Sequence, residues 1–411
     1  MTQFVDIAIV GAGAAGLAAA HRLADAPLSC LVLEARDRVG GRAHTRSIDG
    51  LDLDMGCGWL HSADVNPLVG VAEALGFALD RSPPPWSRPA LNGQAVLETQ
   101  AGFRQALEQL EARIGEAVAR REDVAVSTLM APGETFNPML DAFSSFYNGD
   151  EFDQISTLDY DAYRDTEVNW RVARGYGALI AAHGASAPVR LGAAVTRIDH
   201  GGSRLRLETA QGVLEAGLVI VTTPPPLIAQ GRLAFAPDLP ALRAAAEGLP
   251  LGLADKVFLA FDGAEDFPAD SRLFGDPGRT ETGAYHMRPF GRPMIEAFLG
   301  GRNARALEAA GPDAAAAFAI DELVQLLGSD VRRRLRPLAT TAWAADPWSL
   351  GAYSHAAPGR AAARQALAQP GLERILLAGE ACSPDFFSTA HGAFLTGLAA
   401  ADEALTRLGL N

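Results

Sequence analysis

The residues that most constrain the fold lie near the N-terminus, in the stretch IVGAGAAGLAAA. Gly11, Gly13 and Gly16 have the spacing G-x-G-x-x-G. They follow the apolar run FVDIAIV and open an alanine-rich segment that is typical of a helix. A second apolar run, SCLVLEAR, brings the acidic Glu34 to about 20 residues after the glycines, the spacing seen in dinucleotide-binding βαβ units. The sequence therefore predicts a βαβ unit that binds a dinucleotide.

Each conserved position of such a loop has a physical role, and this chain supplies a suitable residue at each. Gly11 permits the tight turn, Gly13 lets the backbone approach a pyrophosphate, and Gly16 lets the helix pack closely on the strand. The helix N-terminus offers N–H groups and partial positive charge to the phosphates. Glu34 suits ribose hydroxyls and would repel a 2′-phosphate, which disfavours NADP and leaves NAD and FAD open. Arg42, after a pair of glycines, can reach the same pyrophosphate.

The rest of the chain alternates between expected strands and helices. Apolar runs predict strands within 189–226, at 253–262, at 292–301 and at 374–380. Amphipathic spacing predicts helices at 104–122 and 314–335, and a last helix from about residue 390. An acidic segment at 147–165 reads as loop. This order indicates one nucleotide-binding domain built from separated segments, with a second domain inserted into it.

Composition narrows the partners and the compartment. A net charge of −14 and a pI near 5.0 argue against a nucleic-acid partner and permit a cationic substrate. Three cysteines in no metal-ligand spacing favour a reducing, cytoplasmic compartment and predict no metal site. The apolar N-terminus lacks a basic segment and contains Asp6, so we expect it to be structural and not a signal peptide. No apolar stretch is long enough to predict a membrane span.

Lys256 is the residue whose chemistry the composition singles out. The chain has 35 lysine and arginine residues, and Lys256 is its only lysine. It lies inside the apolar run LADKVFLAFD, where we expect it to be buried. Arginine stays charged and planar, whereas a buried lysine is a compact donor that can lose its proton. We therefore predict a functional role for Lys256.

At these residues the chain resembles the flavin-containing amine oxidase family, which includes monoamine oxidases, polyamine oxidases and flavin histone lysine demethylases. The resemblance spans nearly the whole chain in four blocks. They run from the glycine loop through GGRAHT to DMGCGWLHSADVNPL; from NWRVARGYGALI through VTRI to VIVTTP; over LADKVFLAFD; and from TAWAADPWSLGAYSHAAPG to LLAGEACSPDFFSTAHGAFLTG. The resemblance implies FAD as cofactor and an α/β fold. A Rossmann-like FAD-binding domain, similar to that of p-hydroxybenzoate hydroxylase, would carry an inserted α+β substrate-binding domain.

The resemblance also implies domain boundaries and cofactor residues. Residues 1–80, 187–250 and 353–411 would form the FAD-binding domain, and 81–186 and 251–352 the substrate-binding domain. Arg42 resembles the pyrophosphate arginine, and Glu380 the acid that binds FAD hydroxyl groups. The other residues that the resemblance places at FAD are Ala15, Arg36, Gly41, Gly58, Trp59, Val195, Gly379 and Ala390. Ala390 would start a helix whose N-terminus faces the flavin N1/C2=O edge.

On the substrate side, the resemblance assigns five residues to catalysis. Lys256 would hold a water against flavin N5 and assist reoxidation by oxygen. Tyr353 matches one of two aromatic residues that flank the substrate path, and the second position is Thr389, as in polyamine oxidases. His61 and Trp343 complete the set. Three of them have a plain structural alternative: Tyr353 and Trp343 as core residues, and His61 as a hydrogen-bonded structural histidine.

Two further expectations concern the cofactor bond and the acidic segment. Ala352 stands where several monoamine oxidases have a cysteine bonded to the flavin, so we expect non-covalent FAD. The acidic residues could hold a distal ammonium of a diamine, but we favour a solvated loop, because runs of charge usually face water. They are Asp150, Glu151, Asp153, Asp159 and Asp161.

The function implied is oxidation of a C–N bond in a primary or secondary amine, either a monoamine or a polyamine. The substrate would transfer a hydride to flavin N5, and oxygen would then reoxidise the flavin and give hydrogen peroxide. Hydrolysis of the imine would give an aldehyde. Three alternatives stay open: a flavin-dependent desaturase of a non-amine, a non-catalytic flavin-binding protein, and an L-amino-acid oxidase, which needs an arginine placed for a carboxylate. We expect a monomer or a homodimer.

Overall fold

The computed structural model describes residues 3–87, 91 and 94–410. Its larger sheet has eight strands and is parallel at its centre, where β1 pairs with β2 on one side and with β10 on the other. β10 is long enough to pair with β9 over its first half and with β17 over its last residues. In order across the sheet, the strands are β11 (Ala234–Ala236), β8 (Val195–Asp199), β9 (Leu205–Thr209), β10 (Gly212–Val221), β1 (Gln3–Val10), β2 (Cys30–Leu33) and β7 (Val189–Arg190), with β17 (Ile375–Leu377) beside β10.

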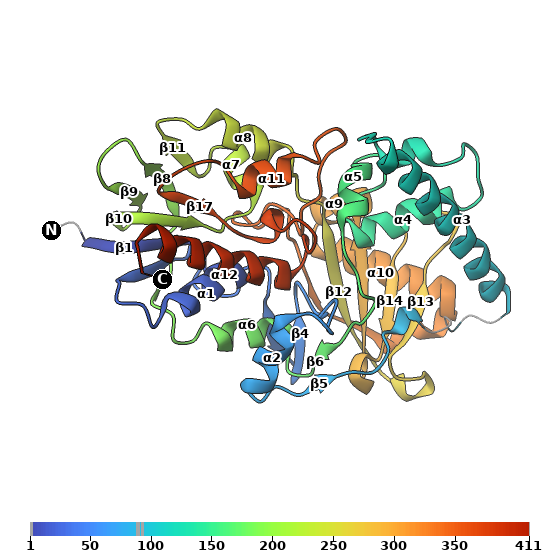
Figure 1. Cartoon of the computed structure of the whole chain (residues 1–411). Helices are drawn as coiled ribbons and strands as arrows, with labels where there is room; N and C mark the ends of the chain where they lie inside the picture. The colour runs from blue at the N-terminus through green and yellow to red at the C-terminus, as the bar shows by residue number, and fades with distance from the viewer. Residues whose placement is uncertain (1–2, 88–90, 92–93, 411) are drawn as a thin grey trace.

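Helices cover both faces of this sheet, which explains why its central strands are apolar throughout. Ile7 and Ile9 of β1 point to the face covered by α1 (Ala14–Leu23) and α12 (Ala390–Arg407). Ala8 and Val10 point to the face covered by α7 (Pro225–Ala229), α8 (Pro240–Glu247) and α11 (Ala363–Ala368). Figure 1 shows α1 and α12 side by side on one face and α7, α8 and α11 on the other.

The second sheet has five antiparallel strands and lies at the other end of the molecule (Figure 1). Its order is β13 (Ser271–Phe274), β14 (Ala284–Met287), β15 (Met294–Gly300), β12 (Ala254–Phe261) and β16 (Leu335–Thr340). One face packs against α10 (Pro312–Leu327) in an apolar core that includes Val257, Ile295 and Leu323. The opposite face carries Lys256 and turns toward the nucleotide-binding half.

The remaining elements close the space around the two sheets. They are α2 (Pro67–Ala74), α3 (Gln94–Ala119), α4 (Asn137–Tyr147), α5 (Thr157–Ala162), α6 (Tyr176–His183), α9 (Gly301–Ala310), and the two strand pairs β3 (Thr45–Ile48) with β4 (Leu51–Asp54) and β5 (Leu79–Asp80) with β6 (Arg171–Val172). Within the described part of the chain, no helix has the length and apolar character of a membrane span.

Two expectations about local structure were wrong. The helix expected at 314–335 ends at Leu327, because Gly328 takes φ +93° and the chain continues as a short 3-10 helix. The acidic segment at 147–165 is not all loop, since it contains α5 and several buried charges. The proposed domain boundaries stay a prediction. The structure shows that the large sheet draws its strands from residues 3–33, 189–236 and 375–377, and the five-stranded sheet from 254–340.

Candidate active site

A continuous cavity of about 960 Å³ connects the glycine loop of the large sheet to the face of β12 that carries Lys256. All the predicted site residues except Gly16 line it. Gly16 lies behind the loop, where a Cβ atom would come within 1.9 Å of the Gly11 carbonyl oxygen. This position matches its predicted role in close packing of helix on strand, and it explains why Gly16 does not face the cavity.

The glycine loop forms the first end of the cavity. Gly11 has φ +104°, a conformation that side-chain-bearing residues rarely adopt. A Cβ atom on Gly13 would meet nothing within 4 Å, so this backbone borders open space. Gly13 also precedes α1 without a side-chain cap, which leaves the first N–H groups of the helix free for an anionic ligand. The loop is therefore shaped for a pyrophosphate.

Glu34 is fixed beside this loop. Its two carboxylate oxygens accept the N–H groups of Ala12 at 2.7 Å and of Arg36 at 2.9 Å. A carboxylate retains further lone pairs after two such bonds, and these can accept ribose hydroxyls. Among the described residues, Arg36 Nε and Thr223 Oγ1 are buried atoms of the cavity wall without a hydrogen-bond partner. Such unpaired groups are expected where a polar cofactor binds, so the residues present fit FAD.

Arg42 and Glu380 form an ion pair at the middle of the cavity. Arg42 Nη1 lies 2.9 Å from Glu380 Oε1 and 2.7 Å from the Ala352 carbonyl oxygen. The other Glu380 oxygen accepts the Ser354 hydroxyl at 2.6 Å and the Ser388 N–H at 2.9 Å. Burial alone would raise the pKa of Glu380, but Arg42 and these donors outweigh it and lower the pKa. Glu380 is therefore ionised and holds Arg42 in place.

The N-terminus of α12 also borders the cavity. Ala390 starts this helix, and the Thr389 side chain caps it by accepting the Gly392 N–H at 3.0 Å. The Thr389 hydroxyl also donates to the Phe386 carbonyl at 2.6 Å. Both hydrogen bonds are made at the start of the helix, so Thr389 acts as its N-cap. Thr389 occupies the second of the two aromatic positions beside the substrate path, so that position has no ring in this chain.

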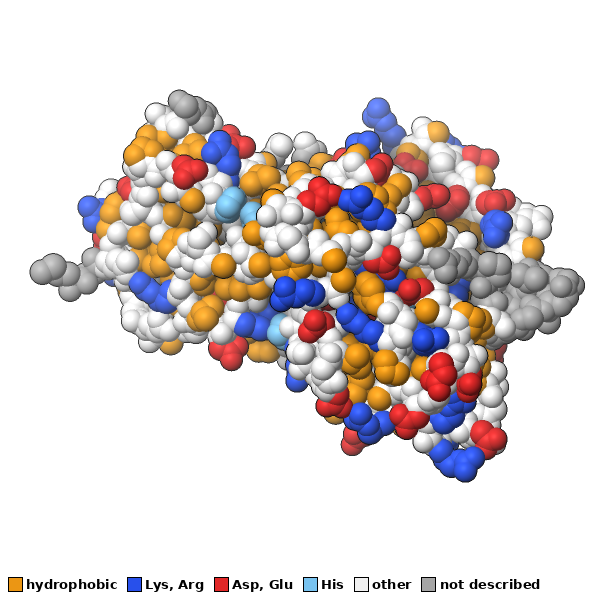
Figure 2. Space-filling model, turned by 90° about the horizontal axis from the view of Figure 1, so that it is seen from below, with side chains coloured by type: hydrophobic (Ala, Val, Ile, Leu, Met, Phe, Trp, Pro, Cys, Tyr) orange, Lys and Arg blue, Asp and Glu red, His pale blue; other side chains and the backbone are white. Residues whose placement is uncertain are grey.

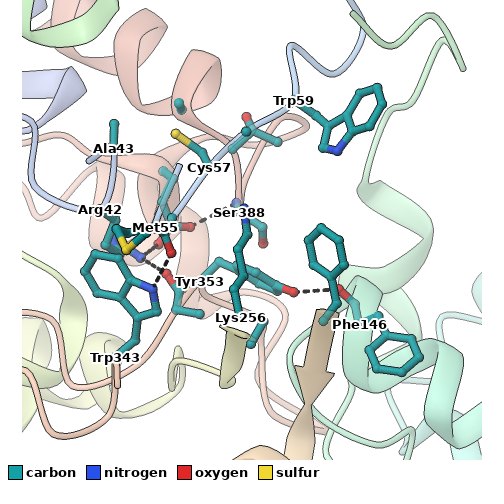
Figure 3. Close-up of a pocket in the computed structure, with 18 of the residues that line it drawn as sticks. Arg42, Ala43, Met55, Cys57, Trp59, Phe146, Lys256, Trp343, Tyr353 and Ser388 are labelled. Carbon is teal, nitrogen blue, oxygen red and sulfur yellow. Dashed lines mark hydrogen bonds and ion pairs between the residues drawn. The ribbon is translucent and has the colours of Figure 1, made fainter. Parts of the chain in front are cut away.

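Lys256 lies in the centre of the cavity floor, with 7% of its surface exposed. Its Nζ donates to the Asp54 carbonyl at 2.9 Å and forms an ion pair with Glu296 at 2.8 Å. A Cβ atom on Gly58 would lie 3.5 Å from this Nζ, so the two predicted residues are neighbours. Figure 3 shows the Lys256 side chain extending into the cavity, with Trp343 to one side and Phe146 and Trp59 to the other.

Aromatic side chains wall the second end of the cavity. The Tyr353 hydroxyl donates to the Phe146 carbonyl at 2.6 Å, a bond drawn in Figure 3. Burial raises the pKa of Tyr353, so the phenol stays protonated. Trp343 donates from its ring N–H to the Met55 carbonyl at 3.1 Å and is 6% exposed. Both rings are held rigidly at the cavity wall.

His61 reaches the same end through a bridge between two loops. Leu60 and Trp170 exchange backbone hydrogen bonds, which brings His61 Nδ1 to 2.6 Å from Asn169 Oδ1. Since an amide oxygen only accepts, Nδ1 carries the hydrogen and Nε2 is free to accept. Burial lowers the pKa of His61, and the bond to Asn169 opposes this only in part. His61 is thus a neutral imidazole at neutral pH.

The five acidic residues singled out in this segment do not line the cavity, which corrects both interpretations offered for them. Asp150 pairs with Arg305 at 2.7 Å, and Asp159 holds Arg364 through two contacts of 2.8 Å. Glu151 is buried beside Arg302, which also binds the exposed Asp153, and Asp161 is exposed. These carboxylates neither contact the cavity nor form a wholly solvated loop. Three of them are buried structural partners of arginines.

Sequence reasoning missed several residues that line the second end and one, Glu296, that contacts Lys256 from beside it. Glu296 and Asn169 were not singled out, although a glutamate in the apolar run MIEAFLG was a visible signal. Asp165, Arg104 and Arg272 also line the cavity. Burial, and then the nearby charge of Arg104, lower the pKa of Arg272. Among the described residues that line this end, two are arginines and one is an aspartate.

The comparisons with known proteins agree with this geometry. A model of the family described as flavin-containing amine oxidoreductase matches residues 14–130 and 132–405. The chain is 28% identical to polyamine oxidase 4 of Oryza sativa subsp. japonica, over 98% of this chain and 89% of that protein.

Two solved structures have the same fold. A putrescine oxidase bound to putrescine gives a TM-score of 0.81 at 20% identity, over 99% of this chain and all of that chain. Cyclohexylamine oxidase from Brevibacterium oxydans gives a TM-score of 0.77 at 21% identity, over 98% of this chain and 99% of the other. The expected architecture, a Rossmann-like FAD-binding part with a substrate-binding part, is confirmed.

Proposed function

This chain belongs to the flavin-containing amine oxidoreductase family and is an FAD-dependent enzyme that oxidises amines; from that premise we propose that its substrate is a small primary or secondary monoamine with an apolar body. One observation carries the proposal. The cavity begins at the glycine loop and ends between aromatic walls around Lys256. Among the described residues that line it, the carboxylates are Glu34, Glu380 and Asp165.

Polyamines carry several ammonium groups, which require carboxylates along the substrate path. The second end of this cavity instead brings Arg104 and Arg272 near the space that the distal part of a substrate would occupy. Apolar rings, including Phe146 and Phe298, suit a hydrocarbon body. Of the proteins compared, cyclohexylamine oxidase is named for a monoamine of this kind.

In this proposal FAD, when bound, accepts the hydride from the carbon next to the amine nitrogen. Tyr353 and Phe146 exclude water from the path, and the Tyr353 ring, fixed by its bond to the Phe146 carbonyl, orients the C–H bond. His61, neutral and with Nε2 free, accepts a hydrogen bond from the amine N–H. Molecular oxygen is the proposed final acceptor, which makes hydrogen peroxide a product, and hydrolysis of the imine gives an aldehyde.

A second candidate substrate is an amine that also carries a carboxylate. The observation that favours it is that Arg104 and Arg272 both line the second end of the cavity. These arginines support the amino-acid oxidase alternative. Membership of the family is compatible with both classes of amine.

We also propose that FAD is bound non-covalently, because Ala352 at the cavity wall has no atom that could bond to the flavin.

The test is anaerobic mixing of the FAD-loaded enzyme with three groups of amines, followed by flavin absorbance. Cyclohexylamine and phenethylamine represent apolar monoamines, putrescine and spermidine represent polycations, and leucine and phenylalanine carry a carboxylate. We expect the first group to bleach the flavin fastest. Faster bleaching by spermidine would contradict the monoamine proposal, and faster bleaching by phenylalanine would establish the second candidate. Acid precipitation should leave the yellow colour in the supernatant.

We also propose a cytoplasmic monomer or homodimer without nucleic-acid or membrane partners. The support is the acidic charge and three cysteines that are all unpaired in the described structure. Burial raises the pKa of each of the three thiols to about 12, so they are unreactive thiols suited to a reducing compartment.

A further inference from the structure

The lysine on the cavity floor has a charged partner on the neighbouring strand. The register of β12 and β15 sets Phe258 opposite Glu296 and Lys256 opposite Phe298. Residues opposite each other, or two apart, share a face of the sheet. Lys256 and Glu296 are therefore diagonal neighbours on the cavity face, and their charged atoms lie 2.8 Å apart. The ammonium also lies 5.2 Å from the Phe298 ring, a favourable cation–π distance.

Glu296 is in turn supported from the next strands. β14 sets His286 opposite Glu296, with His286 Nδ1 at 3.9 Å from Glu296 Oε2. His286 Nε2 lies 3.0 Å from Asp270 Oδ1, and that oxygen lies 2.8 Å from Arg171 Nη1. These side chains form a line of alternating charge and hydrogen-bond partners across the sheet, which we call the Lys256–Arg171 line. It consists of Lys256, Glu296, His286, Asp270 and Arg171.

The far end of the line is a fixed ion pair. Burial would raise the pKa of Asp270, but His286 and Arg171 outweigh it and hold the pKa well below its usual range. Arg171 is 5% exposed, lies over the rings of Trp59 at 5.0 Å and Phe290 at 4.0 Å, and also bonds to Asp80. Neither member of this ion pair can move without breaking several contacts.

The other groups around Lys256 do not replace Glu296. Asp54 offers its backbone carbonyl, while its carboxyl is bonded to the Thr45 hydroxyl and the Tyr176 N–H. Burial raises the pKa of Asp54. Cys57 on the adjoining loop is a neutral thiol, because burial raises its pKa to about 12. Glu296 is thus the carboxylate in direct contact with the ammonium.

Glu322, a buried residue of α10 on the opposite side of the same sheet, shows what a purely structural role looks like. Glu322 accepts the Thr282 hydroxyl, the Gly283 N–H and the Tyr285 hydroxyl at 2.5–2.8 Å. Among the described residues, Glu296 contacts Lys256 and, more distantly, His286. The side-chain contacts that set its position are therefore those with Lys256 and His286.

We propose that Glu296 is a positioning residue for the enzyme: it holds Lys256 as an ammonium and turns one remaining N–H into the cavity, while His286, Asp270 and Arg171 keep Glu296 in place. An ammonium has three N–H donors, and Glu296 and the Asp54 carbonyl use two of them. Lys256 then acts as a fixed cationic donor and cannot accept the proton of the amine. The consequence for turnover rests on the proposed function, whereas the charge of Lys256 can be measured without it.

The single lysine makes that measurement direct. Protein grown with lysine labelled by ¹³C at Cε gives one lysine signal, whose shift reports its protonation. We would follow this signal against pH in the FAD-loaded wild type, in E296Q and in E322Q, the matched buried control. In E296Q we expect the signal to change at a lower pH than in the wild type, because the negative charge beside the ammonium is gone. E322Q should keep the wild-type midpoint even if it unfolds at a lower temperature.

A second variant keeps the proposal testable if E296Q fails to fold. D270N removes the charge that orders His286, and we expect a smaller downward shift of the same signal. An E296Q or D270N midpoint equal to that of the wild type would overturn the proposal. A wild type whose flavin no amine bleaches would contradict the proposed function but would leave the lysine titration interpretable.

Discussion

At the scale of single residues, Asp255 and Lys256 show how adjacent positions in one strand take opposite roles. Lys256 faces the cavity, and Asp255 points to the other face of β12. There one Asp255 oxygen accepts the Thr341 hydroxyl at 2.7 Å and the Trp343 N–H at 3.2 Å. The other oxygen is buried without a donor. Burial, together with Glu308, raises the pKa of Asp255 to about 8, so the carboxyl is protonated at neutral pH.

This raised pKa predicts how stability changes with pH. An unfolded Asp titrates near 3.8, so between pH 4 and 8 the folded chain holds a proton that the unfolded chain has lost. The free energy of unfolding should therefore fall as pH rises, by at most about 1.4 kcal/mol per pH unit from this group. Stability from Asp255 is complete below pH 4 and lost above pH 8.

The substitution D255N supplies a permanently uncharged side chain of the same shape. Its stability relative to the wild type should rise steadily from pH 5 to pH 8, measured by urea unfolding of the FAD-loaded protein. D330N, at an exposed aspartate, is the control and should follow the wild-type curve. Parallel curves for D255N and the wild type would show that Asp255 is ionised in the folded protein.

At the scale of elements, the start of α12 joins stability to the cofactor site. Thr389 satisfies the Gly392 N–H and fixes the direction from which Ala390 enters the helix. We expect T389A to lower the free energy of unfolding by about 1 kcal/mol, the usual cost of losing a threonine cap. T389S should restore most of it, because the serine hydroxyl can make the same bonds. Thermal unfolding would measure both effects.

Turnover by the same two variants separates capping from contact with substrate. If Thr389 only caps, kcat of T389S should match the wild type. A large loss of kcat in T389S with normal stability would instead mean that the missing methyl group contacts the substrate.

How much of the fold and of the site could be predicted depends on how local the relevant sequence pattern is. That the glycine loop, Glu34 and Lys256 lie at one site was predictable, because each is marked by a short contiguous pattern or by an unusual residue in an apolar run. The partnership of Lys256 with Glu296 was not, because it depends on the register of two strands separated by about 40 residues. The end of α10 was misjudged because the pattern continues past Gly328, and only its positive φ shows the break.

At the scale of the whole molecule, the net charge of −14 does not by itself attract an amine to the site. Acidic and basic side chains are interspersed over the face shown in Figure 2. Attraction or repulsion of the substrate therefore depends on the charges that line the cavity; among the described residues of its second end these are Asp165, Arg104 and Arg272. This local balance, and not the total charge, is the basis for preferring a monoamine.

The cavity also links the two sheets, and this predicts the effect of removing FAD. The glycine loop and Glu34 belong to the large sheet, whereas Lys256 and Phe298 belong to the five-stranded sheet, and all of them line one cavity. A ligand that binds only the folded chain stabilises it by mass action, by about 2.7 kcal/mol at a hundred times its Kd. The FAD-free protein should thus unfold at a lower temperature, with its two parts less coupled.

Scanning calorimetry of the FAD-free and FAD-loaded protein would measure this coupling. We expect a broader or divided transition without FAD and a single higher transition when FAD is restored, with a midpoint that rises with FAD concentration. NADP is the matched control ligand, because Glu34 would repel its 2′-phosphate, and it should leave the FAD-free transition unchanged. Identical transitions with and without FAD would mean that the two sheets are joined by protein contacts alone. The pair Arg36–Asp346 would then be a contact to examine, because Arg36 follows β2 of the large sheet and Asp346 follows β16 of the five-stranded sheet.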